Sequence, residues 1–252
     1  MLPTDQNTMQ SELLKFKDYC TASKLTINQE KSKAMLFNRA KKHDFSPELC
    51  LTPGSRLEVV EEMKLVGYQL RSDLRTTSNT EYIIKRAWKR MWVVRRLKSL
   101  GASEQELLSV LRAQVLSVLQ FATPAWSTLI TGKESAQIEC VLKTGLYLVY
   151  GHRYESFSWA LRQAKMSSLS DQRRKMFHNF TKGCINSNKF KKWFAIDEQT
   201  TGTVTRSKKL RFQPIHCRTQ AFARSAIPQM VKLSNSPEFQ ASMKTIVQVI
   251  VV

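Results

Sequence analysis

The chain has 252 residues, of which 42% are hydrophobic, so it is long and apolar enough to bury a substantial core and is not a disordered chain. Only 8 glycines and 7 prolines argue against a turn-rich all-β protein. The 40 Lys and Arg against 20 Asp and Glu give a net charge of +20, and this excess favours a polyanionic partner, usually nucleic acid. An anionic membrane surface and a basic surface without a binding role are the alternatives.

The cysteine and histidine patterns predict no metal site. The five cysteines are scattered singly, none forms C-x-x-C, and the four histidines offer no H-x-x-x-H. The adjacent His216 and Cys217 cannot complete a tetrahedral zinc site by themselves. An odd, unpatterned set of cysteines fits a reducing compartment, so we expect an intracellular protein, either nuclear or cytoplasmic.

Nothing in the sequence predicts targeting to or insertion into a membrane. The first residues lack the basic start and the apolar segment of a signal peptide. No stretch holds 18 consecutive apolar residues, and the apolar run 246–252 is far too short to span a bilayer. We therefore expect no membrane partner.

The first 76 residues predict a mixture of one helix and short strands. Residues 8–23 have apolar side chains at near-helical spacing, which predicts an amphipathic helix. Residues 34–37 predict a short apolar strand, and residues 38–56 predict a loop, because they are first basic and then rich in turn-forming residues. Two further short strands are predicted at 57–60 and 64–70.

From residue 79 onward the pattern is almost entirely helical. A helix over 80–100 places Ile83, Ile84, Ala87, Trp88, Met91 and Val94 on one face and five cations on the other, and Gly101 ends it. Ser103-x-x-Glu106 predicts a capping box that opens the next helix, which stops before Pro124. Further helices are predicted over 133–150, 155–165, from 170 onward, and over 221–233. Residues 187–210 read as a polar and basic linker.

Three consecutive segments carry a resemblance to a known family. They are KLTINQEKSKAMLF at 24–37, MKLVGYQL at 63–70, and the helical tract 82–168 with its Arg-Ala-x-x-Arg-Met and Pro-Ala-Trp patterns. In this order they resemble the C-terminal part of a non-LTR (LINE-type) retrotransposon reverse transcriptase. The first is similar to the last palm motif, the second to the primer-grip hairpin, and the third to the thumb. The resemblance covers residues 10–230.

The resemblance implies an RNA-directed DNA polymerase of a transposable element that binds an RNA or DNA primer–template duplex. The intact family enzyme holds Mg²⁺ on aspartates that include an Asp-Asp pair just before the first helix. This sequence has no Asp-Asp, and Asp5 in Pro-Thr-Asp-Gln does not match that motif. We therefore expect a truncated chain that retains no cofactor site and has no polymerase activity alone, because two-metal catalysis needs converging carboxylates.

Particular residues follow from these patterns. The resemblance implies that Lys31 approaches the phosphates of the incoming nucleotide, although it could be an ordinary solvated lysine. The resemblance also implies that Gly67, which lacks Cβ, lets a primer backbone approach closely and that Lys64 contacts nucleic acid, although Gly67 could be an ordinary strand or turn glycine. The density of cations on the helix over 80–100 favours phosphate contacts over an ordinary solvent-exposed face. These nucleic-acid-binding candidates are Lys85, Lys89, Arg90 and Arg96. We expect the five tryptophans to be packing residues rather than base-stacking platforms.

The sequence thus predicts an α+β fold, with a small sheet remnant and one helix followed by a mostly helical region. The expected division is residues 1–76 for the palm remnant, 77–186 for the helical thumb and 187–252 for a basic linker and tail. The rival hypothesis is a basic helical nucleic-acid-binding protein with no polymerase ancestry. Such a protein has no reason to contain the two palm-like motifs in order.

Overall fold

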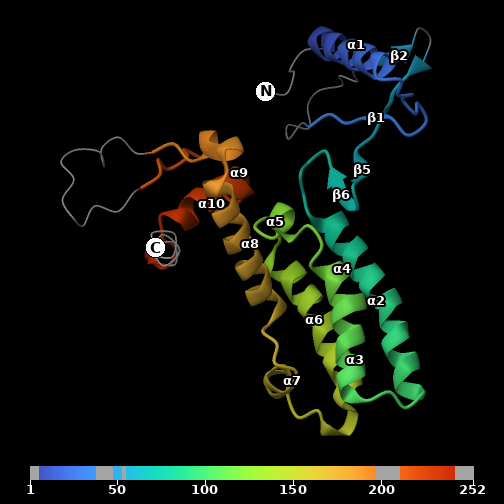
Figure 1. The fold of residues 1–252 in the computed structure, drawn as a ribbon, viewed down its shortest axis with the longest axis vertical. Helices are drawn as coiled ribbons and strands as arrows, with labels where there is room; N and C mark the ends of the chain where they lie inside the picture. Colours follow the sequence, from blue (N-terminus) through green and yellow to red (C-terminus); the bar gives the residue numbers. More distant parts are fainter. Residues whose placement is uncertain (1–5, 38–47, 53–54, 197–210, 242–252) are drawn as a thin grey trace, which may run out of the picture. The chain divides into compact units, whose positions relative to one another are not determined.

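A computed structural model describes residues 6–37, 48–52, 55–196 and 211–241 of the chain. The chain forms two compact units, divided between Asn79 and Thr80 (Figure 1). Among the described residues, the first unit holds one long helix and six short strands, and the second is mostly helical. This arrangement confirms the predicted α+β class with a mostly helical C-terminal region.

The first unit consists of helix α1 (Gln6–Ala22) and three separate strand pairs. Strand β1 (Lys33–Ala34) pairs in parallel with β4 (Glu58–Val59), and β2 (Cys50–Thr52) pairs antiparallel with β3 (Ser55–Arg56). Strands β5 (Glu62–Leu65) and β6 (Tyr68–Arg71) form an antiparallel hairpin. The predicted strand piece at 64–70 is therefore this hairpin, whereas the piece at 57–60 belongs to a different pair.

Two expectations for the first unit are wrong. The strand expected over 34–37 is only Lys33–Ala34, because β4 offers a partner just two residues long. The resemblance also predicts that Leu13, Leu14, Phe16, Met35 and Phe37 pack between the first helix and the strands, but Leu14, Phe16 and Phe37 are 45%, 55% and 44% exposed. With so few paired strands, the unit has too little sheet to cover the apolar face of α1.

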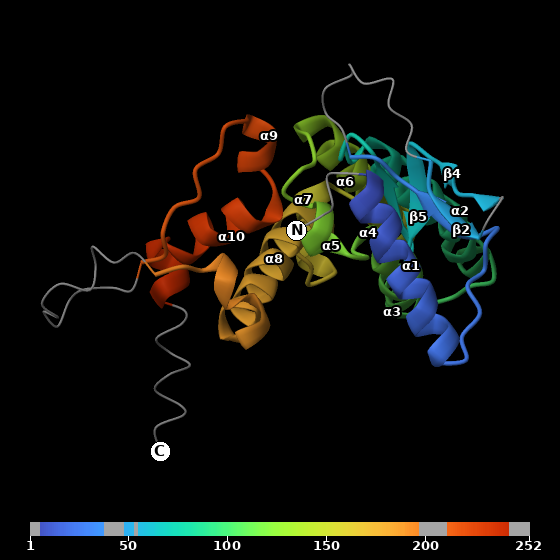
Figure 2. The same ribbon diagram turned by 90° about the horizontal axis from the view of Figure 1, so that it is seen from above.

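The second unit is built from helices connected by short turns. Helix α2 (Thr77–Ser99) begins at the end of the first unit and continues into the second. The helices that follow are α3 (Glu104–Val110), a π-helical segment (Leu111–Leu116), α4 (Ser117–Leu119), α5 (Thr123–Trp126), α6 (Gly132–Tyr150), α7 (Phe157–Gln163), α8 (Leu169–Asn186), α9 (Gln220–Ala223) and α10 (Ala226–Ser234). In Figure 1 the segments α3, α4 and α6 lie alongside α2, and Figure 2 shows α10 lying next to α8.

The helix ends follow the sequence signals closely. Gly101 has φ +85°, and the N–H groups of Gly101 and Ala102 donate to the carbonyls of Lys98 and Leu97, which is the hydrogen-bond pattern of a Schellman motif. Ser103 and Glu106 form the predicted capping box of α3. Thr131 and Glu134 form a second capping box at α6 that the sequence reading did not identify.

The core of the second unit lies between α2, α6 and the helical run from α3 to α5. Gly145 on α6 brings two helices close, because a Cβ there would lie 2.6 Å from Leu111 Cδ1 and 3.3 Å from Met91 Cε. Trp126 is fully buried, and its indole N–H donates to the carbonyl of Phe121 at 2.9 Å. The buried tryptophan is therefore a packing residue, as predicted.

Residues 187–196 are not the polar linker that the sequence predicted. Asn188–Trp193 form a 3₁₀ helix. Phe194 is buried with Phe177 of α8 and Met230 of α10, and the rings of Phe194 and Phe212 meet edge to face. The polar and basic composition of this segment suggested a linker. Its aromatic residues nevertheless pack against α8 and α10. Residues 197–210 lie outside the described part of the chain.

One stretch of the described chain, Glu104–Trp126, is long and apolar enough to cross a membrane by length and composition. Its apolar residues include Leu107, Leu111, Val115 and Trp126, and each of these is at most 2% exposed within the second unit. The stretch is also interrupted at Ala122, which has φ +49°. Of its apolar window, 39% is buried inside the helical unit.

Candidate nucleic-acid interface

The outward face of α2 gathers most of the predicted nucleic-acid-binding residues. Lys85, Lys89 and Arg96 are all exposed and lie at helical spacings of four and seven residues, which places them on one face. Arg95, which the sequence reading did not single out, is exposed beside them. The opposite face, with Ile83, Ala87, Met91 and Val94, is buried, so the cations are held outward by the packing of the helix.

Two tryptophans interrupt this line of cations. Trp88 is 37% exposed and Trp92 is 64% exposed, so neither ring is enclosed in the core of the helical unit. Trp88 follows the buried Ala87 by one residue, a rotation of about 100°, and this carries its ring to the edge of the apolar face. Trp92 lies four residues further on. A wheel centred on Ala87, Met91 and Val94 would have placed both rings among the cations.

A shallow hollow runs beside this face. Its walls are Ile84, Lys85, Trp88 and Lys89 of α2, with Gln137 and Cys140 of α6, and Glu81 lies at one end. The α2 side of the hollow therefore carries apolar and aromatic groups beside two ammonium groups. A planar base against Trp88 with its phosphates toward Lys85 and Lys89 matches the chemistry of this wall.

Arg90 does not share the outward face. Its side chain is half-buried, and Nη1 donates to the backbone carbonyl of Gln114 at 3.0 Å. Arg86 is likewise directed along the helix, where Nη1 donates to the Tyr82 hydroxyl at 3.3 Å. The prediction that Arg90 contacts phosphates is not favoured by this geometry, because its guanidinium serves a contact within the unit.

In the first unit, Lys64 and Gly67 belong to the β5–β6 hairpin. Leu65 pairs with Tyr68, so Val66 and Gly67 form a two-residue loop, and both have positive φ, +49° and +90°. A type I′ hairpin turn requires this backbone at both positions, and glycine adopts it without strain. Turn geometry alone therefore accounts for Gly67. Lys64 is exposed on β5 opposite Gln69.

The lysines of the first palm-like motif sit in a turn and at a strand. Lys31 is exposed, and its backbone N–H donates to Asn28 Oδ1 at 3.0 Å, which fixes the turn before β1. Lys33 pairs with Glu58 through an Nζ–Oε2 distance of 2.8 Å. Lys31, in contrast, is exposed and forms no ion pair with the described residues. It therefore stays the candidate for a phosphate contact.

Arg71, the last residue of β6, donates from Nη1 to Ser78 Oγ in the first turn of α2 at 3.4 Å. Arg71 donates from Nε and Nη2 to the two carboxylate oxygens of Asp73, each at 3.1 Å. This bond and the N–H of Arg75 lower the pKa of Asp73 below its usual value, although burial opposes them. The pair fixes the turn that follows β6.

A metal ion of the kind that the resemblance implies does not fit the described residues. Among them, no group of three or more His, Cys, Asp or Glu side chains converges to hold a metal. Asp5 lies outside the described part of the chain. No step of chemistry can therefore be assigned to Mg²⁺ here.

Comparison with protein-family models, with curated proteins and with solved structures found no match to this chain.

Proposed function

We propose that this chain binds nucleic acid along the exposed face of α2 and descends from the C-terminal part of a non-LTR retrotransposon reverse transcriptase. The observation that carries the binding proposal is the alternation of Lys85, Lys89 and Arg96 with Trp88 and Trp92 on one exposed helical face. Cations spaced along a helix contact successive phosphates, and exposed indole rings offer stacking surfaces to bases.

The descent is supported by the order of the two palm-like segments, KLTINQEKSKAMLF and MKLVGYQL, ahead of a helical unit. The second segment holds a hairpin with a tight turn at Val66–Gly67, which suits a grip on a primer strand. The polymerase activity of the family is not assigned to this chain, because it lacks the Asp-Asp pair.

The binding mode is tested by two sets of substitutions on α2. Changing Lys85, Lys89 and Arg96 together to Ala is expected to flatten the slope of log affinity against log salt by about two to three units, if each meets one phosphate. The matched control changes Lys143, Arg162 and Lys175 to Ala, since these are exposed elsewhere on the unit and remove the same charge. Equal effects of both sets would mean that only the overall charge matters.

Substituting the two tryptophans tests the contribution of base stacking separately from that of charge. Stacking contributes about 1–3 kcal/mol per base, so W88A/W92A is expected to weaken binding to a single strand by about tenfold or more. Binding to a duplex of equal length should change less, because its bases are already stacked. The W88F/W92F variant, which keeps aromatic faces, should recover part of the loss. Fluorescence anisotropy of a labelled oligonucleotide measures all of these affinities.

The descent has its own test. We expect the genomic sequence upstream of this coding region to encode Tyr/Phe-Ala-Asp-Asp in frame. A locus with unrelated upstream sequence would favour the rival hypothesis of a basic helical protein without polymerase ancestry, and it would leave the binding proposal standing.

A further inference from the structure

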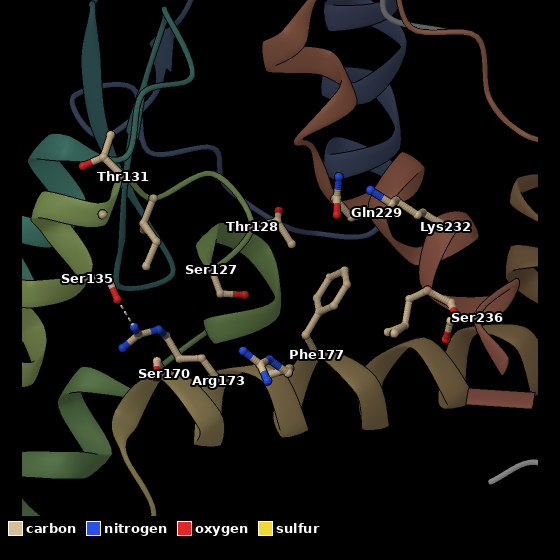
Figure 3. Close-up of a pocket in the computed structure, with 14 residues that line it drawn as sticks. Ser127, Thr128, Thr131, Ser135, Ser170, Arg173, Phe177, Gln229, Lys232 and Ser236 are labelled. Carbon is tan, nitrogen blue, oxygen red and sulfur yellow. Dashed lines mark hydrogen bonds between the residues drawn. The ribbon is translucent and has the colours of Figure 1, made fainter. Parts of the chain in front are cut away.

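A cavity of about 560 Å³ lies within the second unit, away from the exposed face of α2 (Figure 3). Its walls are the loop between α5 and α6, the first turns of α6 and α8, and one side of α10. The loop supplies Ser127 and Thr128, and α10 supplies Gln229 and Lys232. Phe177 and Leu233 give the cavity an apolar side.

A buried arginine lines this cavity. Arg173 of α8 is only 5% exposed, and its Nη2 donates to Ser135 Oγ at 2.6 Å, as the dashed line in Figure 3 shows. Its Nη1 is buried and has no hydrogen-bond partner among the described residues. Guanidinium stays charged in proteins, so a buried N–H left without an acceptor is unfavourable. The group can therefore donate a hydrogen bond to an anionic oxygen.

The charged groups around Arg173 do not fully compensate for the burial of its guanidinium. Glu139 is the carboxylate that acts on Arg173; its Oε1 accepts the N–H of Leu169 at 3.0 Å, and its Oε2 is buried without a hydrogen-bond partner among the described residues. Burial lowers the pKa of Arg173, and Glu139 offsets only part of that effect. Among the described residues that line the cavity there is no Asp or Glu, while Arg174 and Lys232 stand exposed at its rim. Arg174 has only a loose contact with Asp171, at 3.9 Å.

Further donors converge on the same space. Thr128 Oγ1 is buried and has no hydrogen-bond partner among the described residues. Gly132 is the first residue of the 19-residue helix α6 and lines the cavity, so the positive end of a long helix dipole adds to the cations, and the Glu134 carboxylate of the capping box offsets part of it. Ser135 and Ser170 add hydroxyl groups. Three cations, hydroxyls and a helix N-terminus around one cavity are the donor set that oxyanions require.

We propose that this cavity binds a phosphate group, with the Arg173 guanidinium at its base and Arg174 and Lys232 at its rim. Arg173 contributes the Nη1 donor, and the N-terminus of α6 and the Thr128 hydroxyl complete the shell. The site is independent of the α2 face: its residues come from α5 to α10, and binding there needs no contact with Trp88 or Lys89.

The test is a titration of the full chain with inorganic phosphate at constant ionic strength, followed by isothermal calorimetry and by backbone amide NMR. We expect shifts concentrated at Gly132 and at residues 127–135. Removing both rim charges with R174Q/K232Q should weaken phosphate binding by about tenfold or more, since charge-assisted hydrogen bonds are lost. The control K143Q/K175Q removes two charges from exposed lysines outside the cavity and should leave the affinity within about twofold.

A second variant addresses the buried group. R173Q should abolish phosphate binding, and circular dichroism shows whether the unit remains helical. If R173Q does not fold, the exposed rim variant still decides, because R174Q/K232Q changes no buried contact. Absence of phosphate binding by the parent chain, or equal losses in R174Q/K232Q and K143Q/K175Q, would overturn the proposal.

The source of the phosphate is distinguished by competition. If a nucleic-acid duplex releases the inorganic phosphate from the loaded chain while Gly132 stays shifted, the site takes a backbone phosphodiester. If the duplex binds and leaves the affinity for inorganic phosphate unchanged, the site takes the phosphate of a small molecule. Both results support a phosphate site, and they differ only in the molecule that carries it.

Discussion

The guanidinium of Arg90 on α2 donates a hydrogen bond to the backbone carbonyl of Gln114, with Nη1 and the oxygen 3.0 Å apart. Gln114 lies in the π-helical segment Leu111–Leu116, where the helix between α3 and α4 is widened. The bond ties α2 to this segment on the side of the helix that faces the unit. Neighbouring Lys89 is free of this contact and is exposed.

The first prediction compares these two neighbours. K89Q should reduce the salt slope of nucleic-acid binding by about 0.7–0.9, the value for one lost phosphate contact. R90Q should leave that slope unchanged and lower the free energy of unfolding by about 0.5–1.5 kcal/mol, because a hydrogen bond between helices is lost. Anisotropy titrations over a range of salt, with urea unfolding of each variant, measure both quantities. An equal reduction of the salt slope by both substitutions would mean that Arg90 also contacts a phosphate.

The second prediction concerns catalysis. The purified chain should not extend a primer on an RNA or DNA template with Mg²⁺ or Mn²⁺, because two-metal polymerisation needs converging carboxylates and the sequence has no Asp-Asp pair. The measurement is a primer-extension assay on product gels, with an active reverse transcriptase as the control. Extension that co-purifies with the chain through successive columns would contradict this expectation.

The third prediction uses two glycines in long helices. G145A places a Cβ 2.6 Å from Leu111 Cδ1, inside a packed core, whereas Gly183 on α8 has no atom within 4 Å of such a Cβ. Both changes gain helix propensity of up to about 1 kcal/mol, but overpacking costs about 1–3 kcal/mol. G183A should therefore stabilise the second unit, and G145A should be less stable than G183A by about 1–3 kcal/mol. Urea unfolding followed by circular dichroism gives the comparison. A G145A variant as stable as G183A would show that Leu111 can move aside without loss.

The fourth prediction is a dependence of stability on pH. Burial of His178, with nearby Lys182, lowers its pKa below the ordinary value of 6.5, and its ring lies 4.6 Å from that of Phe239. A lowered histidine pKa means that the unfolded chain binds the proton more readily. The contribution of His178 is therefore complete above pH 6.5 and is lost as pH falls through the folded-state pKa. Unfolding measured from pH 7.5 to 5 should show this loss in the parent and a flatter profile in H178Q.

The helices were predictable because their signals are local. Periodic apolar residues, the glycine at 101 and the box Ser103-x-x-Glu106 each act within a few residues, and α2 and α6 formed close to their expected bounds. The single helix expected from this box to just before Pro124 is instead a run of α3, the π-helical segment and α4, which ends at Leu119. The hairpin at 62–71 was expected from the resemblance of residues 63–70 to a primer grip rather than from a local turn signal. Where the signal depends on distant partners, the sequence reading failed: the strand at 34–37 lacked a partner long enough, and Leu14 and Phe16 lacked a surface to cover them.

The candidate interface was predictable in part. Lys85, Lys89 and Arg96 could be placed on one face from spacing alone. We expected Trp88 and Trp92 to pack because large hydrophobic side chains are usually buried. Their positions around the helix instead leave both rings exposed. The phosphate cavity had no sequence signal, because Arg173, Thr128 and Lys232 lie on elements that are distant in the chain and meet only in the folded unit.

The two units differ greatly in how much apolar surface they bury, and this governs how the chain melts. Among the described residues of the first unit, only Cys20, Ala34 and Leu49 are buried apolar side chains, whereas the second unit buries a continuous set from Ile83 to Phe239. A chain with two unequal cores is not expected to lose its structure in one cooperative step. The first unit should open at low denaturant while the helices persist, so a single melting temperature describes only the helical unit.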